Sequence, residues 1–128
     1  MKKILPFIGL VTIMIYSSIS YANAADAAKG KKVYNKCRAC HTLAAGKHRI
    51  GPSLNGVLGR KAGTAEKYRY SKAMVKAGVG GLVWDEKSLG EYLKKPRAFI
   101  KGTKMVFPGL KKPTDLANLI AFLKEAAK

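Results

Sequence analysis

The chain has 128 residues, of which 25 are lysine or arginine and seven are aspartate or glutamate, and its formal net charge is +18. A chain of this length forms one small domain, and a positive field of this strength favours encounter with acidic partners. Nucleic acid is disfavoured as the partner because the lysines occur as scattered pairs, such as 31–32 and 111–112, without a nucleic-acid-binding motif.

Residues 1–24 have the pattern of a secretory signal peptide. Two lysines near the start precede an apolar stretch over 4–19, and Ala-Asn-Ala at 22–24 fits an A-x-A cleavage site. We therefore expect a cleaved leader, a mature domain of residues 25–128 and a location in the periplasm. The apolar stretch is shorter than the roughly 20 residues of a spanning helix, so an uncleaved membrane anchor is the alternative.

The first predicted helix of the mature chain runs from Asp26, as its N-cap, to about Cys40. Gly30 lies in the middle of this helix, where glycine costs about 1 kcal/mol relative to alanine. Its presence indicates that another backbone passes close by, and we expect that backbone to be the last helix.

Cys37, Cys40 and His41 form the sequence C-x-x-C-H, which is the attachment signature of covalently bound c-type haem. Residues three apart share one face of a helical turn at about 5–6 Å, so both thiols can reach the two vinyl groups of one porphyrin. His41 then lies beneath the iron and can supply one axial bond. The sequence predicts one haem c per chain, attached through both cysteines.

Other uses of these residues fit less well. A disulfide oxidoreductase also has C-x-x-C, but its cysteines follow a strand, and the residues before Cys37 predict none. A zinc site needs four ligands at suitable spacing, whereas six residues separate His41 from His48 and the chain has only two cysteines and two histidines. His48 is also disfavoured as a second axial ligand, because so short a connection would have to cross the haem face.

Residues 42–70 are predicted to form a loop, which is long for so small a domain unless it packs on a cofactor. A short helix is expected over 71–77, ended by Gly78, and a further helix is capped by Asp85 and ended by Pro96. The last helix begins at 113–115. Its apolar stripe consists of Leu116, Leu119, Ile120 and Leu123. No strand is predicted, so the fold class is all-α.

Two methionines of the mature chain could supply a sulfur ligand to the iron. Met74 lies in the short helix, where an apolar core position is its ordinary role. Met105 lies in a glycine-containing loop between two helices, which can carry its sulfur to the face opposite His41. The residues alone leave both candidates open.

An ordered series of motifs extends over nearly all of residues 26–127. It comprises Gly30 with Tyr34, the C-x-x-C-H sequence, Gly-Pro-Ser-Leu-Asn-Gly at 51–56, Leu-Gly-Arg at 58–60, Tyr68 to Tyr70, Trp84, Tyr92-Leu93, Gly-Thr-Lys-Met at 102–105 and the closing helix. In this series the chain resembles a bacterial class I, mitochondrial-like cytochrome c. The resemblance implies a small fold of helices and loops around one covalently attached haem.

The resemblance also implies the residues of the site. Met105 would be the second axial ligand, and the carbonyl of Pro52 would accept a hydrogen bond from Nδ1 of His41. Further cofactor contacts are implied for Arg60, Tyr70 and Trp84 at the haem propionates and for Tyr92 and Thr103 near the methionine sulfur.

With both axial positions filled, iron has no open position for a substrate, which favours an electron carrier over an enzyme such as a haem peroxidase. The resemblance implies a quinol:cytochrome c reductase as donor and a terminal oxidase or similar acceptor. We expect a monomer that forms transient complexes with partners whose docking surfaces are acidic. The implied docking ring consists of Lys36, Arg38, Lys47, Lys95, Arg97, Lys101, Lys104 and Lys111.

Overall fold

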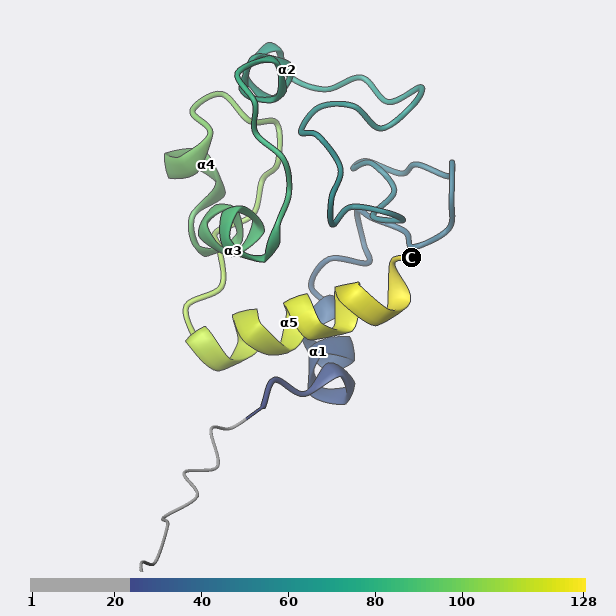
Figure 1. The fold of residues 1–128 in the computed structure, drawn as a ribbon, viewed down its shortest axis with the longest axis vertical. Coiled ribbons are helices and arrows are strands. Elements are labelled where there is room, and N and C mark those ends of the chain that lie inside the picture. Colours follow the sequence, from purple (N-terminus) through teal and green to yellow (C-terminus); the bar gives the residue numbers. More distant parts are fainter. Residues whose placement is uncertain (1–23) are drawn as a thin grey trace, which may run out of the picture.

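The structure is a computed structural model that describes residues 24–128, so the expected signal peptide lies outside the described residues except for Ala24. Within this range there are five α-helices, and the longest connection runs from α1 to α2 (Figure 1). They are α1 (Ala27–Tyr34), α2 (Lys72–Val79), α3 (Glu86–Lys94), α4 (Pro96–Phe99) and α5 (Pro113–Ala126). None of these helices has the length and hydropathy needed to cross a membrane. Residues 24–128 contain no strand, only one antiparallel bridge between Lys61 and Val83.

Helix α1 begins where the sequence predicts and ends earlier. The side chain of Asp26 accepts a hydrogen bond from Lys29 N and caps the helix. The prediction that the helix continues to Cys40 is wrong. After Tyr34 most backbone hydrogen bonds join residues three apart instead of four: Cys37 N donates to Tyr34 O at 2.8 Å, and Cys40 N donates to Cys37 O at 3.0 Å. Successive turns therefore carry the C-x-x-C-H sequence.

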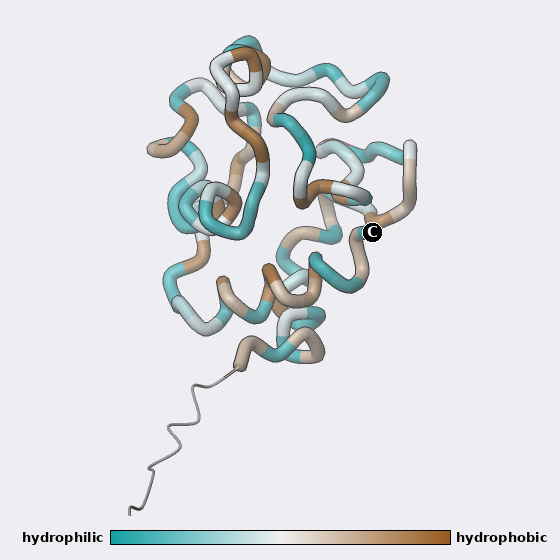
Figure 2. The backbone as a smooth tube through the Cα atoms, viewed as in Figure 1, coloured by the Kyte–Doolittle hydropathy of each residue, from teal (hydrophilic) through white to brown (hydrophobic). Residues whose placement is uncertain are grey.

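The expected close approach at Gly30 is confirmed. Helices α1 and α5 cross here (Figure 1), and a Cβ atom on Gly30 would collide with the backbone carbonyl of Asn118 and with Phe122 in α5. Beside the crossing, the rings of Tyr34 and Phe122 lie 5.3 Å apart. Figure 2 shows apolar and polar residues alternating around α5, and the apolar side includes Leu119, which is 1% exposed.

The 42–70 segment forms no helix, as predicted, and folds back onto the residues before α3. Trp84 N donates to Arg60 O at 2.9 Å, and Ala62 N donates to Leu82 O at 2.9 Å. Helix α2 runs two residues beyond its expected end at Ala77. Gly78 does not end it, because this glycine serves a close packing contact with the backbone of Ala62.

Helix α3 has the expected cap and the expected end. The Asp85 carboxylate accepts from Ser88 N at 2.6 Å, and Ser88 Oγ accepts from Asp85 N at 3.0 Å, which forms a capping box. The helix ends at Lys94, two residues before Pro96. Helix α4 was not expected from the sequence. Pro96 begins this single turn at its first position, where its missing N–H costs nothing.

Replacement of Gly30 by alanine should lower the free energy of unfolding by at least about 2 kcal/mol, because the new methyl group overlaps α5. Denaturant unfolding of the purified protein measures this loss. Gly90→Ala is the matched control: its Cβ would meet Ile120 and Leu116 at 3.6 and 3.7 Å, an ordinary contact, so a gain of roughly 0.5–1 kcal/mol is expected. Equal effects of the two substitutions would contradict the packing argument.

Candidate functional site

The His41 ring is half-buried and held in one orientation. Its Nδ1 atom lies 2.8 Å from the carbonyl oxygen of Pro52. Because a carbonyl only accepts, Nδ1 carries the proton and donates it, and Nε2 keeps its lone pair for a metal. Gly51 packs directly on the ring, since a Cβ there would overlap its atoms. Burial and the positive charge of Arg60 lower the pKa of His41, which favours the neutral ligand form.

Cys37 and Cys40 are half-buried, and neither forms a disulfide within residues 24–128. Burial raises the pKa of the Cys37 thiol to about 11. A dithiol enzyme needs an accessible thiolate near neutral pH, so this surrounding disfavours such chemistry. Over the same residues, no cluster of three or more His, Cys, Asp or Glu side chains forms a metal site.

Arg60 carries an unmatched donor. Its Nη1 and Nη2 atoms donate to the carbonyls of Asn55 and Ser53 at 3.0 and 3.1 Å. Its Nε atom is buried and has no hydrogen-bond partner among the described residues. A buried donor of a charged group is costly to leave unpaired, so this N–H is available to an acceptor such as a carboxylate.

Thr103 and Met105 meet the side chain of Tyr92. The Tyr92 hydroxyl lies 2.8 Å from Thr103 Oγ1 and 3.5 Å from the sulfur of Met105. Met105 N donates to Thr103 Oγ1 at 3.3 Å, so the hydroxyl also fixes the backbone of the loop. Burial raises the pKa of Tyr92 and the Thr103 hydrogen bond opposes this, so the phenol stays a donor at neutral pH. Met74, in contrast, is 8% exposed and belongs to the hydrophobic core.

His48 is engaged by backbone groups through both ring nitrogens. Ser53 N donates to Nδ1 at 3.0 Å, so the proton lies on Nε2, which donates to Glu66 O at 2.7 Å. In this arrangement His48 connects three points of the loop and has no nitrogen left for a metal.

A sequence model of the family described as cytochrome c matches residues 27–127. The chain belongs to the cytochrome c family. It is 56% identical over 98 residues to cytochrome c2 of Afifella marina, an alignment that covers 76% of this chain and 79% of the relative. Cytochrome c2 of Agrobacterium tumefaciens strain II Chrys is 48% identical over 99 residues, 77% of this chain and 89% of the relative.

A solved structure agrees with these relationships. Cytochrome cH from Methylobacterium extorquens superposes with a TM-score of 0.71 at 44% identity, over 78% of this chain and 98% of that chain. The protein is thus a bacterial class I c-type cytochrome that takes part in electron transport and carries covalent haem c. The expected all-α fold and the expected cofactor are confirmed.

The residues of this cytochrome fit a covalent haem. Two unpaired thiols, an imidazole with a free Nε2 and the unmatched Nε of Arg60 lie on neighbouring turns and loops. Trp84 is buried, with its ring centroid 5.0 Å from that of Tyr92, and its backbone pairs with Arg60. Tyr70 is half-buried, and its ring lies 4.7 Å from that of Tyr68.

Three residues that support the cytochrome site were not among the predicted site residues. They are Gly51, which packs on His41, and Ser53 and Asn55, whose carbonyls bind Arg60. All three lie in the Gly-Pro-Ser-Leu-Asn-Gly motif at 51–56, in which only Pro52 was a predicted site residue. The motif was therefore the available signal.

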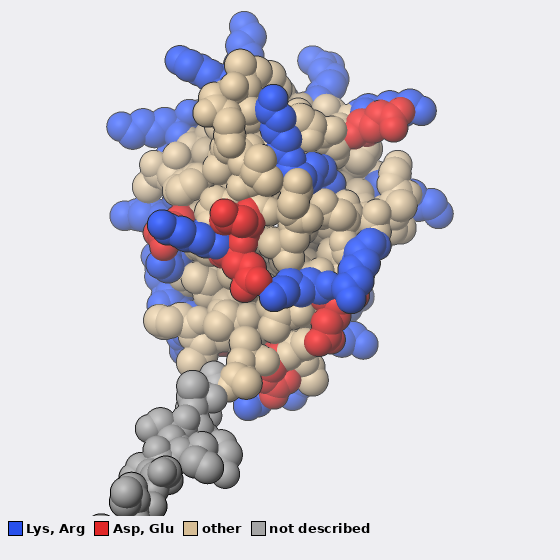
Figure 3. Space-filling view, viewed as in Figure 1, with Lys and Arg blue, Asp and Glu red and all other residues tan. Residues whose placement is uncertain are grey.

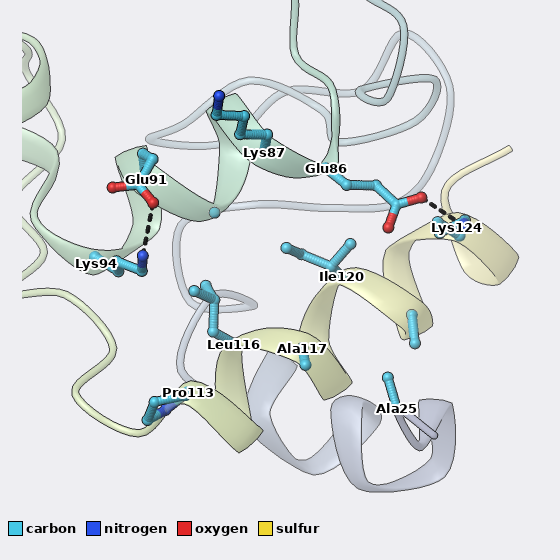
Figure 4. A pocket seen from close by; sticks show the side chains of 12 residues that line it. Ala25, Glu86, Lys87, Glu91, Lys94, Pro113, Leu116, Ala117, Ile120 and Lys124 are labelled. Atoms are coloured by element: carbon cyan, nitrogen blue, oxygen red, sulfur yellow. Dashed lines mark hydrogen bonds and ion pairs between the residues drawn. The ribbon is translucent and has the colours of Figure 1, made fainter. Parts of the chain in front are cut away.

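A surface groove of about 530 Å³ lies between α3 and α5 of the cytochrome (Figure 4). Leu116 and Ile120 line it from α5. Ion pairs between Glu91 and Lys94 and between Glu86 and Lys124, each with 2.6 Å between nitrogen and oxygen, lie along its edges. None of the predicted cofactor-binding residues lines this groove, so it is separate from the haem site.

Charge is unevenly distributed over the described part of the cytochrome. Six of the seven acidic residues lie in or next to α1, α3 and α5, and Figure 3 shows acidic side chains gathered near α3 and α5. Lysines and arginines project around the rest of the outline. All eight residues of the implied docking ring are exposed.

Substitution of Gly51 by alanine should displace His41 from the Pro52 carbonyl, because the methyl group would occupy the position of the ring. We expect a loss of about 1–3 kcal/mol in the free energy of unfolding and a changed haem absorption spectrum. Gly80→Ala is the control, since its Cβ would meet its nearest atoms only at 3.4 Å. A wild-type spectrum and wild-type stability in Gly51→Ala would refute the role of this contact.

Proposed function

We propose that this cytochrome is a one-electron carrier whose iron is bound by Nε2 of His41 and the sulfur of Met105. The observation that carries the proposal is the His41–Pro52 hydrogen bond directly after the two cysteines, which leaves one imidazole nitrogen for the iron. Cys37 and Cys40 would hold the haem through thioethers. The bound haem supplies the one-electron redox couple.

The surroundings of Met105 support it as the second ligand. Its side chain is half-buried in a loop, and the hydroxyls of Tyr92 and Thr103 fix the sulfur and the backbone. A thioether is a soft ligand that favours ferrous iron, and an apolar pocket disfavours the extra charge of ferric iron. Both effects would raise the reduction potential, and an iron held by both His41 and Met105 would have no open position for a substrate.

Arg60, with Tyr70 and Trp84, is proposed to bind the haem propionates. The unmatched Nε of Arg60 supports this assignment, since a carboxylate would supply the missing acceptor. Tyr92 and Thr103 would act on the other side by orienting the sulfur of Met105.

The proposed partners are membrane redox complexes with acidic docking surfaces. The donor would be a quinol:cytochrome c reductase, and the acceptor would be a terminal oxidase or a similar complex. The exposed lysines and arginines of the docking ring support this, because charge steering gives fast association through small interfaces.

We propose that the carrier works as a monomer in the periplasm after cleavage at residue 24. A retained leader would make it a membrane-anchored carrier, and the mass of the purified protein distinguishes the two forms.

Absorption spectra of the exported protein in both oxidation states test the central assignment. A c-type spectrum with the near-infrared sulfur-to-iron band is expected in the ferric form. Carbon monoxide should bind slowly or not at all to the ferrous protein. Rapid binding would favour an open-iron enzyme such as a peroxidase.

Met105→Ala should open the sixth coordination position and lower the reduction potential, because the soft donor is lost. Spectroelectrochemistry measures the potential, and the near-infrared band should disappear. Met74→Leu serves as the control, since it changes a methionine of the core to an apolar residue of similar volume. An unchanged ferric spectrum in Met105→Ala would remove this residue from the ligand set.

Charge reversal at Lys104 or Arg97 should slow electron exchange with a purified quinol:cytochrome c reductase several-fold at low salt. The difference from wild type should shrink as salt rises, because the screening length falls from about 10 Å at 0.1 M to about 3 Å at 1 M. Lys31→Glu reverses an exposed charge outside the docking ring and should have a smaller effect. Slowing that is independent of salt would contradict charge steering.

A further inference from the structure

We propose that Asn55 is a positioning residue that fixes Arg60 for its interaction with the haem propionates. The inference rests on the proposed role of Arg60 and adds a support that reaches it from the end of α5. It starts from the observation that residues far apart in the sequence, 55–56 and 127–128, are joined by two hydrogen bonds beside the Arg60 binding partners.

The direction of the Arg60 guanidinium is set by one turn of the chain. Both of its bound nitrogens donate to backbone carbonyls of this turn, Nη1 to Asn55 at 3.0 Å and Nη2 to Ser53 at 3.1 Å. The guanidinium is planar, so two fixed nitrogens also fix the third. The direction of Nε, the atom left for a carboxylate, therefore depends on where the carbonyls of residues 53 and 55 lie.

The turn at residues 53–56 is itself held by the backbone at the end of α5. Asn55 Nδ2 donates to Lys128 O, and Gly56 N donates to Ala127 O, with 2.5 Å between donor and acceptor in each case. Ala127 is 4% exposed, so its carbonyl is anchored in the core. Gly56 is exposed and has a positive φ of 63°, so the two bonds to residues 127 and 128 meet the turn on its exposed side.

On the inner side, the Ser53 hydroxyl holds the same turn. Ser53 is 3% exposed, its Oγ donates to Ala44 O at 2.7 Å, and it accepts from Asn55 N at 3.1 Å. The turn is thus hydrogen-bonded on one side through the Ser53 hydroxyl and on the other side to the end of α5. Of these hydrogen-bonding groups, the side chain of Asn55 can be removed without disturbing a buried residue.

An asparagine suits this position because its amide supplies a donor to the Lys128 carbonyl without adding charge near Arg60. Aspartate has no donor when ionised, and alanine has none at all. A cation held near the haem disfavours the additional positive charge of ferric iron and so raises the potential. If Arg60 moves more freely, this contribution falls.

The test is Asn55→Ala in the haem-loaded protein, with the reduction potential as the measurement. We expect a potential below that of wild type. The same substitution in an Arg60→Gln background should give no further shift, because nothing is left to position. This double-mutant cycle distinguishes an effect through Arg60 from a direct effect of Asn55.

Asn118→Ala is the matched control. The Asn118 side chain accepts from Asp26 N at 2.7 Å, so it also ties α5 to a segment far away in sequence, but it lies where α1 crosses α5 and not at the C-terminal end of the helix. Both alanine variants should unfold at lower denaturant concentration than wild type. Only Asn55→Ala should change the potential.

The outcomes separate this inference from the proposed function. An unchanged potential in Arg60→Gln overturns the propionate role of Arg60, and the positioning role with it. A lowered potential in Arg60→Gln with a wild-type potential in Asn55→Ala overturns the positioning role alone. The same holds if Asn55→Ala gives its full shift in the Arg60→Gln background, or if Asn118→Ala gives an equal shift.

Discussion

The close crossing of α1 and α5 at Gly30 is the contact on which the rest of the molecule depends. The turns that carry both cysteines and His41 follow α1 directly, so their position is set by where α1 lies on α5. The far end of α5 binds the turn that supplies carbonyls to Arg60. One helix therefore supports both His41 and Arg60, although each lies in a segment without regular structure of its own.

The long loop before α2 is held in shape by hydrogen bonds from polar side chains to backbone groups. His48 uses both ring nitrogens on backbone partners, and Ser53 binds two further backbone groups. These bonds hold Pro52 in place for His41. These bonds position the site residues of the loop without a sheet or a helix pair. Among the buried side-chain nitrogen and oxygen atoms of the described residues, only the Arg60 Nε has no hydrogen-bond partner.

Much of the fold could be predicted because its signals are local. Asp85 caps a helix, Gly30 marks a close approach, and the spacing of Cys37 and Cys40 indicates the cofactor. The role of Gly78 could not, since it depends on the backbone of Ala62, which only the folded chain brings close. The early end of α1 could not either, because the residues after Tyr34 keep local backbone hydrogen bonds but form turns instead of a regular helix. The acceptors of Arg60 were hidden for another reason: they are backbone carbonyls, which every residue has.

The burial of Cys37 has a consequence for how the protein is assembled. With the pKa of its thiol raised to about 11 by burial, Cys37 stays a protonated thiol at neutral pH in this folded arrangement. The folded arrangement is thus a poor starting point for bond formation with a vinyl group. Bond formation with a vinyl group would therefore be easier in a chain whose Cys37 is open to water than in this closed arrangement.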